Sequence, residues 1–197
     1  MPRTEAQYEE IRESKRSLIK NTALKLFAEQ GYDNTSISQI GKTAGISKGL
    51  LYNYFESKDD LLQNIMETLS EEFAEIIDPD RDGEVTDEEA VKFLDDFFAM
   101  LITRREEFQL YYRLIFQPVV KEFLRTKFDN SRYKNRQLLI FRYFGKRIPA
   151  KDERNSLFTV NAFLKGLIWE YIYAPDQFSE EFMTGYKEFL KKMIWSE

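Results

Sequence analysis

Apolar side chains recur at helical spacing along most of the chain. Between residues 19 and 27 they fall three or four positions apart, at Ile19, Ala23, Leu26 and Phe27, which places them along one face of a helix. No stretch shows a convincing alternation of apolar and polar residues, the pattern of a half-buried strand. The sequence therefore predicts an all-α protein.

Start and stop signals divide this pattern into short helices near the N-terminus. The first predicted helix stops at Gly31, a residue suited to a left-handed cap. The run Asn34–Ser36 signals the start of a second helix, Ser47 caps a third, and Ser57 caps a fourth that extends to Ile77. Residues 1–56 are therefore predicted to form a three-helix module.

Longer helical patterns fill the rest of the chain. Pro118, Pro149 and Pro175 mark boundaries, because proline is tolerated in a first turn and costly in a helix interior. The predicted helices cover residues 87–104, 106–117, 118–147 with a break near Asp129, 152–174 and 179–195. Residues 57–197 are thus predicted to form a second, larger helical domain.

The second and third helices are predicted to form a helix-turn-helix. The predicted inward residues are Ile37, Ile40, Ala44, Ile46, Leu51 and Phe55, which leaves the outer face of the third helix free for a DNA major groove. The residues predicted to read base pairs there are Lys48 and Asn53 by hydrogen bonds, Leu50 by packing on a thymine methyl group, and Gly49 by letting the backbone approach.

Phosphate contacts are predicted on either side of these residues. Tyr52, Tyr54 and Lys58 can reach the DNA backbone, and Thr35 and Ser36 offer hydroxyl and backbone N–H groups to another phosphate. The alternative is that both tyrosines simply pack in a small bundle and that the lysines are solvated. Composition alone supports the two interpretations about equally.

Residues 19–62, IKNTALKLFAEQGYDNTSISQIGKTAGISKGLLYNYFESKDDLL, closely resemble the N-terminal domain of TetR-family transcriptional regulators. The resemblance rests on A-x-x-L-F-x-x-x-G from Ala23, T-S-x-x-x-I from Thr35, A-G-I-S from Ala44, and L-Y-x-Y-F-x-x-K from Leu51; Tyr54 stands where many members carry histidine. It implies that the third helix reads operator DNA, and that the larger domain binds a small ligand and forms a dimer.

Charge distribution agrees with this division. The net charge is −5, but residues 11–58 hold eight basic and four acidic residues, a local +4 that leaves −9 for the remainder. A basic N-terminal module on an acidic body fits a double-stranded DNA partner.

Missing residue types and segments exclude other classes of protein. The chain has no cysteine and no histidine, which removes thiolate and imidazole chemistry, so no enzymatic activity is expected. It also has no run of about 18 apolar residues and no apolar N-terminal signal. The expectation is a cytoplasmic protein without a membrane partner.

The middle of the chain is rich in aromatic residues, most of which are expected to be ordinary core. Those that could line an effector site would suit a flat, apolar or cationic molecule. The predicted ligand-binding residues are Phe97, Leu101, Phe108, Tyr111, Tyr112, Phe116 and Phe141.

The last two helices are apolar on more than one face. They are predicted to form a four-helix bundle across a homodimer, although they could instead close the core of one subunit. A dimer would read a palindromic operator, and the small-molecule effector would release it. The predicted function is therefore a ligand-responsive regulator, with repression as the expected sign.

The segment DPDRDGEVTDEE, residues 78–89, matches the calcium-loop pattern D-x-[DN]-x-[DN]-G-x₅-E. Asp78, Asp80 and Asp82 would supply carboxylate oxygens, Glu84 its carbonyl, and Glu89 both carboxylate oxygens. No cofactor is required by the predicted function. Calcium at this loop would make the chain a calcium-responsive helical regulatory or interaction protein, and an acidic capped turn is the alternative.

Overall fold

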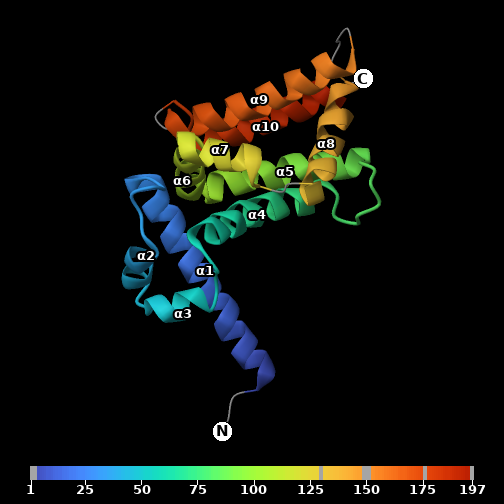
Figure 1. Cartoon of the computed structure of the whole chain (residues 1–197). Coiled ribbons are helices and arrows are strands. Elements are labelled where there is room, and N and C mark those ends of the chain that lie inside the picture. The colour runs from blue at the N-terminus through green and yellow to red at the C-terminus, as the bar shows by residue number, and fades with distance from the viewer. Residues whose placement is uncertain (1–3, 129–130, 148–151, 175–176, 196–197) are drawn as a thin grey trace. The chain divides into compact units, whose positions relative to one another are not determined.

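The computed structural model describes residues 4–128, 131–147, 152–174 and 177–195, and all regular structure in them is α-helical (Figure 1). The helices are α1 (Glu5–Gln30), α2 (Ile37–Thr43), α3 (Lys48–Tyr52), α4 (Lys58–Ile77), α5 (Asp87–Thr103), α6 (Arg105–Ile115), α7 (Pro118–Thr126), α8 (Ser131–Gly145), α9 (Glu153–Tyr173) and α10 (Glu180–Trp195). The all-α prediction is confirmed. The boundaries predicted at Asp129, Pro149 and Pro175 lie outside the described residues.

The chain folds as two compact units. The first comprises Met1–Thr68 and Leu110–Asp129, and the second comprises Leu69–Gln109 and Asn130–Glu197. Helices α4 and α6 each contribute to both units. The first unit therefore contains more of the chain than the predicted module of residues 1–56, whose boundary stays a prediction.

Buried apolar side chains of α1, α2 and α3 form the core of the N-terminal part of the first unit. Phe27, Ile40 and Leu51 have no exposed surface, and Phe55 is 1% exposed. Because Leu51 and Phe55 are four positions apart across the end of α3, their burial fixes which face of this short helix points inward. The predicted inward positions are confirmed except for Ala44 and Ile46, which are half-buried.

Serine side chains cap the short helices as predicted. The Ser36 hydroxyl accepts a bond of 3.2 Å from the Gln39 N–H, and the Ser47 hydroxyl one of 3.1 Å from the Leu50 N–H. Ser57 does the same for the Asp60 N–H at 3.0 Å. Each serine satisfies a backbone donor that the first turn of a helix leaves without a partner.

The turn between α2 and α3 requires a close backbone approach. The Ile46 N–H donates to the Gly41 carbonyl oxygen at 2.9 Å, and Gly45 has a positive φ of 70°. A Cβ added to Gly41 would lie 3.0 Å from the Ile46 carbonyl oxygen. Only glycine at position 41 allows α2 and the turn to pack this closely without a shift of the backbone.

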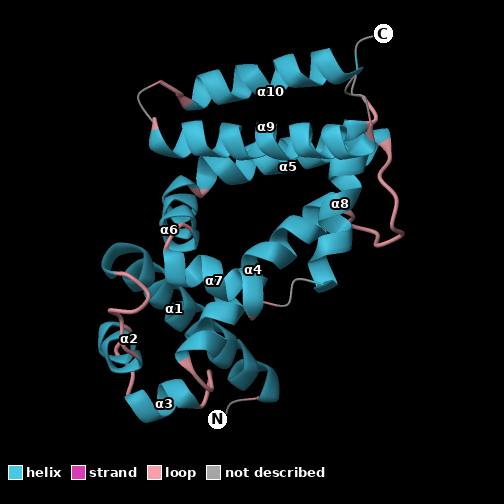
Figure 2. Cartoon of the chain, turned by 45° about the horizontal axis from the view of Figure 1, so that its top comes forward, coloured by secondary structure: helices cyan, strands magenta, loops and turns pink. Residues whose placement is uncertain are grey.

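The second unit is built around α5, α8, α9 and α10, with α9 and α10 running alongside each other (Figure 2). Phe93, Phe97 and Phe98 of α5 are at most 2% exposed and pack as stacked and edge-to-face rings. Asp95 on the same helix lies 2.8 Å from the Lys187 ammonium and 2.6 Å from the Lys191 ammonium of α10. Apolar packing and these ion pairs together join α10 to α5.

Among the described residues, no helix combines the length and the apolar character that crossing a bilayer needs.

Gly41→Ala tests the close approach in the turn. Since the new methyl group meets a backbone oxygen, we expect the free energy of unfolding to fall by about 1–3 kcal/mol. Gly49→Ala is the matched control, because its Cβ would meet nothing within 4 Å and helical alanine is favoured over glycine by about 0.5–1 kcal/mol. Urea denaturation of the three proteins gives the measurement, and equal stability of the two variants would contradict the expectation.

Candidate functional site

The outward face of α3 carries the predicted base-reading residues. Lys48, Gly49 and Asn53 are exposed, Leu50 is half-buried, and nothing lies within 4 Å of where a Cβ of Gly49 would be. Asn53 ends the helix as its C-cap, its N–H donating to the Leu50 carbonyl oxygen at 3.1 Å. The five-residue helix therefore leaves polar side chains and open backbone accessible to a partner.

Three of the predicted phosphate contacts also lie at this surface. Tyr52 is 46% exposed, and the Lys48 ammonium lies 5.9 Å from the centre of its ring. Ser36 is exposed at the first turn of α2, and Tyr54 is half-buried. Contacts of these residues with DNA stay predictions, although their positions are compatible with them.

Thr35 and Lys58 have structural roles instead. Thr35 is 1% exposed, and its hydroxyl donates to the Gly31 carbonyl oxygen at 2.8 Å. The Lys58 ammonium donates to the carbonyl oxygens of Tyr32 at 2.9 Å and Thr35 at 3.2 Å, and lies 4.3 Å from the centre of the Tyr32 ring. The Thr35 hydroxyl is buried against backbone oxygens, and the contacts of Lys58 hold the loop between α1 and α2. Phosphate contacts of these two residues stay predictions.

Further polar contacts hold the same loop. The Tyr32 hydroxyl donates to Asp59, which also receives a hydrogen bond of 2.6 Å from Lys127. The bond from Lys127 and that from Tyr32 lower the pKa of Asp59 below its ordinary value, whereas burial and then the bond to Asp59 raise the pKa of Tyr32. Asp59 thus remains an anion that joins the loop to α7.

Gln117 makes the second link between the loop and the start of α7. Its side-chain oxygen accepts from the Tyr32 N–H at 2.7 Å, and its side-chain nitrogen donates to the Phe27 carbonyl oxygen at 2.6 Å. The oxygen and the nitrogen of the Gln117 carboxamide therefore both bind backbone groups at the end of α1. This explains why residues 110–129 belong to the first compact unit.

A surface hollow joins the first turns of α1 to α3. It is lined by Tyr8, Glu9, Ile11, Arg12, Lys15, Leu50 and Tyr54. Sequence reasoning did not single out its α1 residues. The signal was present, because Tyr8, Arg12 and Lys15 are spaced by four and three positions and so share one face of the helix.

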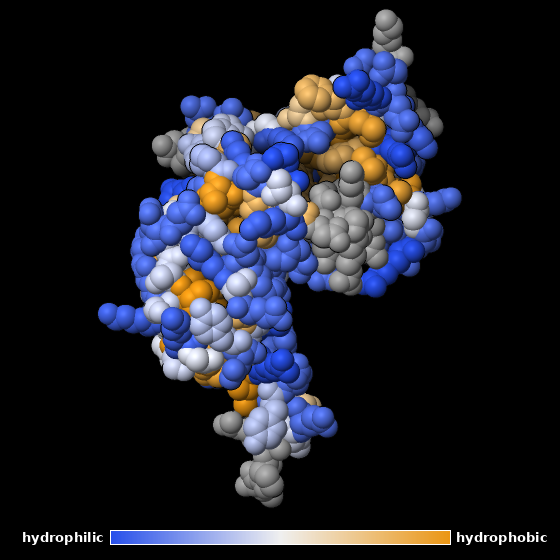
Figure 3. All heavy atoms as spheres, viewed as in Figure 1, coloured by the Kyte–Doolittle hydropathy of each residue, from blue (hydrophilic) through white to orange (hydrophobic). Residues whose placement is uncertain are grey.

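The second unit contains an apolar cavity of about 340 Å³ between α5, α8, α9 and α10. Figure 3 shows hydrophobic residues gathered around a hollow in the upper right of the view, near α8 and the end of α10 in Figure 1. The lining residues are Leu94, Phe144, Arg147, Thr159, Val160, Phe163, Leu164, Leu190, Met193 and Ile194. Its size is near the lower end of ordinary small-molecule sites, which span roughly 300–1,000 Å³.

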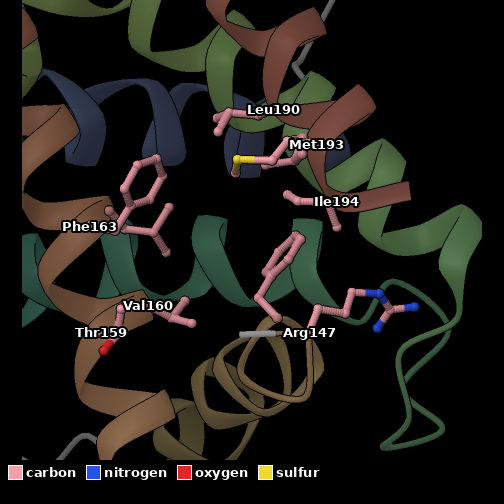
Figure 4. Close-up of a pocket in the computed structure, with 10 residues that line it drawn as sticks. Arg147, Thr159, Val160, Phe163, Leu190, Met193 and Ile194 are labelled. Atoms are coloured by element: carbon pink, nitrogen blue, oxygen red, sulfur yellow. The ribbon is translucent and has the colours of Figure 1, made fainter. Parts of the chain in front are cut away.

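Arg147 is the only charged residue among the described residues of this lining, and its charge is paired with a carboxylate. The guanidinium lies 2.6 Å from an Asp87 carboxylate oxygen and 3.8 Å from the centre of the Tyr143 ring. Figure 4 shows the guanidinium pointing away from the apolar side chains of α9 and α10. Thr159, the other polar lining residue, donates its hydroxyl to the Asn155 carbonyl oxygen at 2.9 Å.

None of the seven predicted ligand-binding residues lines this cavity. Phe97, Leu101 and Phe108 are at most 2% exposed and form core of the second unit. Tyr111, Tyr112 and Phe116 belong to the first unit, and Phe141 is half-buried on α8. The prediction identified an aromatic-rich region, but helical spacing could not separate packed rings from rings beside a space.

The last two helices expose a large apolar surface. The exposed large side chains there are Phe158, Phe163, Trp169, Tyr173, Phe182, Phe189 and Met193. On α10, Phe182 stacks on Tyr186 and Tyr186 on Phe189, each at 5.9 Å between ring centres, which makes a continuous stripe. Val160, Ile168, Tyr171 and Leu190 of the same two helices are buried within the second unit.

Loop 78–89 brings three aspartates together. Carboxylate oxygens of Asp78, Asp80 and Asp82 lie within 4.8 Å of one another, with Asp78 buried and the other two exposed. Glu89 faces the start of α5, where its carboxylate accepts from the Thr86 N–H at 2.8 Å in a capping box. Glu84 donates its N–H to Asp82 at 2.8 Å. The geometry matches the acidic capped turn at Glu89 and a candidate cation cluster at the aspartates.

Comparison with known proteins agrees with the geometry of the first unit. Residues 19–65 match the family model for bacterial regulatory proteins of the tetR family. The chain is 45% identical over 64 residues to the HTH-type transcriptional regulator HbdR of Aromatoleum sp. (strain CIB), a match that covers 30% of this chain and 28% of HbdR. It is 28% identical over 182 residues to the regulator AcrR of Shigella flexneri, covering 83% of this chain and 80% of AcrR.

The likeness in fold extends over most of the chain. The crystal structure of NalD, described as the secondary repressor of the MexAB-OprM multidrug efflux pump in Pseudomonas aeruginosa, has a TM-score of 0.64 and 20% identity. That comparison covers 93% of this chain and 95% of NalD. The protein is thus of the helix-turn-helix class, with a larger helical C-terminal domain. Over residues 19–65 it is similar to the TetR family of transcriptional regulators.

Proposed function

We propose that the protein is a DNA-binding transcriptional repressor, active as a homodimer, that a small-molecule effector releases from a palindromic operator. The observation that carries this proposal is α3, held by buried Leu51 and Phe55 while Lys48, Gly49 and Asn53 face outward. This helix lies inside the stretch that matches the family. Repression is supported by the likeness in fold to the repressor NalD, and the predicted cytoplasmic location follows from a chromosomal DNA partner.

Residues on and near α3 can contact DNA in two ways. Lys48 and Asn53 can hydrogen-bond base edges in the major groove, and exposed Gly49 lets the helix backbone come close. Tyr52, Tyr54 and Ser36 can hydrogen-bond phosphates, which position the helix without reading sequence. A two-fold dimer would present two such helices about 34 Å apart, one turn of the DNA, to two half-sites.

The apolar stripe on α10 and the exposed rings of α9 support the homodimer. Contiguous apolar surface of this kind marks an interaction site, and a second copy of the chain offers the same surface in return. Phe182 and Phe189 are 46% and 55% exposed on α10, where burial against a partner would remove apolar area from water.

The cavity between α5, α8, α9 and α10 supports an uncharged, apolar effector. Its lining offers apolar side chains, while Arg147 and Thr159 already have hydrogen-bond partners. A charged ligand would lose its hydration there without gaining an unengaged counter-charge from the lining. Release from DNA then requires that the effector bind one arrangement of the dimer better than the other.

DNA binding is tested by selecting duplexes from a random pool and measuring affinity against salt. We expect the logarithm of the binding constant to fall steeply with the logarithm of salt concentration, because phosphate contacts release counterions. Lys48→Ala should relax base preference at one position of each half-site, at a cost of about 1–3 kcal/mol, whereas Tyr52→Phe should weaken all duplexes alike. Lys192→Ala on α10 is the control, and a wild-type protein that enriches no duplex would contradict the proposal.

Dimerisation is tested by Phe189→Glu, measured by sedimentation equilibrium. A charge in the apolar stripe should raise the dimer dissociation constant at least tenfold, because it cannot be buried against a second copy without losing its hydration. Thr184→Glu adds the same charge to the opposite, exposed side of α10 and should leave the constant unchanged. A wild-type monomer, or equal effects of the two substitutions, would count against the interface.

The effector cavity is tested by Val160→Trp with the uncharged dye Nile red as probe. Val160 is 3% exposed and lines the cavity, so the larger ring should fill it and weaken saturable dye binding at least tenfold. Thr184→Trp adds the same ring outside the lining and should bind dye like the wild type. Unchanged binding by Val160→Trp would show that the dye, and by inference an apolar effector, binds elsewhere.

Calcium binding at loop 78–89 is a second proposal, supported by the clustered oxygens of Asp78, Asp80 and Asp82. Calorimetric titration should show saturable heat at millimolar calcium, and Glu89→Gln should weaken it if Glu89 leaves its capping box to bind the ion. Glu88→Gln, which removes a charge from the neighbouring position, is the control. Absence of saturable heat from the wild-type protein would end this proposal.

A further inference from the structure

The first turns of α1 share a surface with the recognition helix. Tyr8, Arg12 and Lys15 line the same hollow as Leu50 and Tyr54 of the α3 region, all within the first compact unit. A molecule that lies against α3 at Leu50 therefore also lies next to this face of α1.

Four of the cations of α1, at positions 12, 15, 16 and 20, divide into two groups. Arg16 donates to Asn64 and lies 5.0 Å from the centre of the Phe55 ring, and Lys20 donates to Thr68 at 2.8 Å. Arg12 and Lys15, by contrast, take part in no hydrogen bond or ion pair with the residues that the structure describes. Arg12 is exposed and Lys15 half-exposed, so both charges remain available to an external anion.

We propose that Tyr8, Arg12 and Lys15 form a second phosphate-contacting surface, which grips the DNA backbone beside the groove that α3 enters. This inference rests on the proposed function. The two cations match the charge of a phosphate, and the phenol of Tyr8, whose side chain is 59% exposed, can donate a hydrogen bond to it. Glu9 in the same hollow carries a single negative charge, which opposes phosphate binding. Contacts from a second element would fix the orientation of the five-residue α3 on the duplex.

The salt dependence of DNA binding measures these contacts directly. Each phosphate neutralised contributes about −0.9 to the slope of log K against log salt. Arg12→Ala and Lys15→Ala should each reduce the magnitude of the slope by about 1, and the double variant by about 2. Base preference should not change, because phosphate contacts carry no sequence information directly.

Glu9→Gln provides a test of opposite sign. Removing the one acidic group of the hollow should strengthen binding at low salt, whereas a face directed away from DNA would be insensitive to this change. Lys25→Ala, an exposed lysine on the same helix outside the hollow, is the matched control and should keep the wild-type slope. Thermal denaturation of every variant establishes that the fold is unchanged.

The outcomes separate this inference from the proposed function. If the wild type binds a selected duplex with a steep salt dependence and the double variant keeps that slope, the α1 surface does not contact phosphate. A change in base preference in Arg12→Ala or Lys15→Ala would likewise overturn the phosphate assignment. If the wild type binds no duplex at all, the proposed function itself fails.

Discussion

The burial of Leu51 and Phe55 is the interaction on which the DNA-binding surface depends. Helix α3 has five residues, far too few for an isolated helix to persist in water. Its conformation is therefore set by its buried side chains, by the Ser47 cap, and by the close packing of Gly41 against the turn. The same burial decides which side chains face outward, so the exposure of Lys48 and Asn53 is a consequence of core packing.

Several polar residues near this helix stabilise the first unit through hydrogen bonds. Thr35, Lys58 and Gln117 satisfy backbone groups at the end of α1 and in the following loop, where no regular helix can do so. Asp59 joins that loop to Lys127. Residues 110–129 consequently fold with the N-terminal helices. Helices α4 and α6 each contribute residues to both compact units.

The second unit is acidic in sequence yet apolar where a ligand could bind. Several of its charges are paired with one another: Asp95 with Lys187 and Lys191, Arg104 with Glu72 and Glu107, and Arg147 with Asp87. Such partly exposed pairs contribute little to stability. The pair with Asp87 engages Arg147, the one charged side chain among the described residues of the cavity lining. Apolar surface that these pairs do not cover is concentrated in the cavity and on the outer face of α9 and α10. This is where the proposed effector and the second subunit would bind.

The sequence by itself determined the all-α architecture, the helix limits at Gly31, Ser36, Ser47 and Ser57, and the inward positions of Leu51 and Phe55. These features depend on periodicity and on hydrogen bonds between residues three or four positions apart. Both can be predicted from residues that are close in the sequence. Only the tertiary structure decided that Thr35 is buried and that Lys58 donates hydrogen bonds to the loop between α1 and α2. It also decided that none of the seven predicted ligand-binding residues lines the cavity. It also brought the face of Tyr8, Arg12 and Lys15 beside α3. Each of these depends on which distant residues meet, and that is set by the packing of whole helices rather than by local spacing.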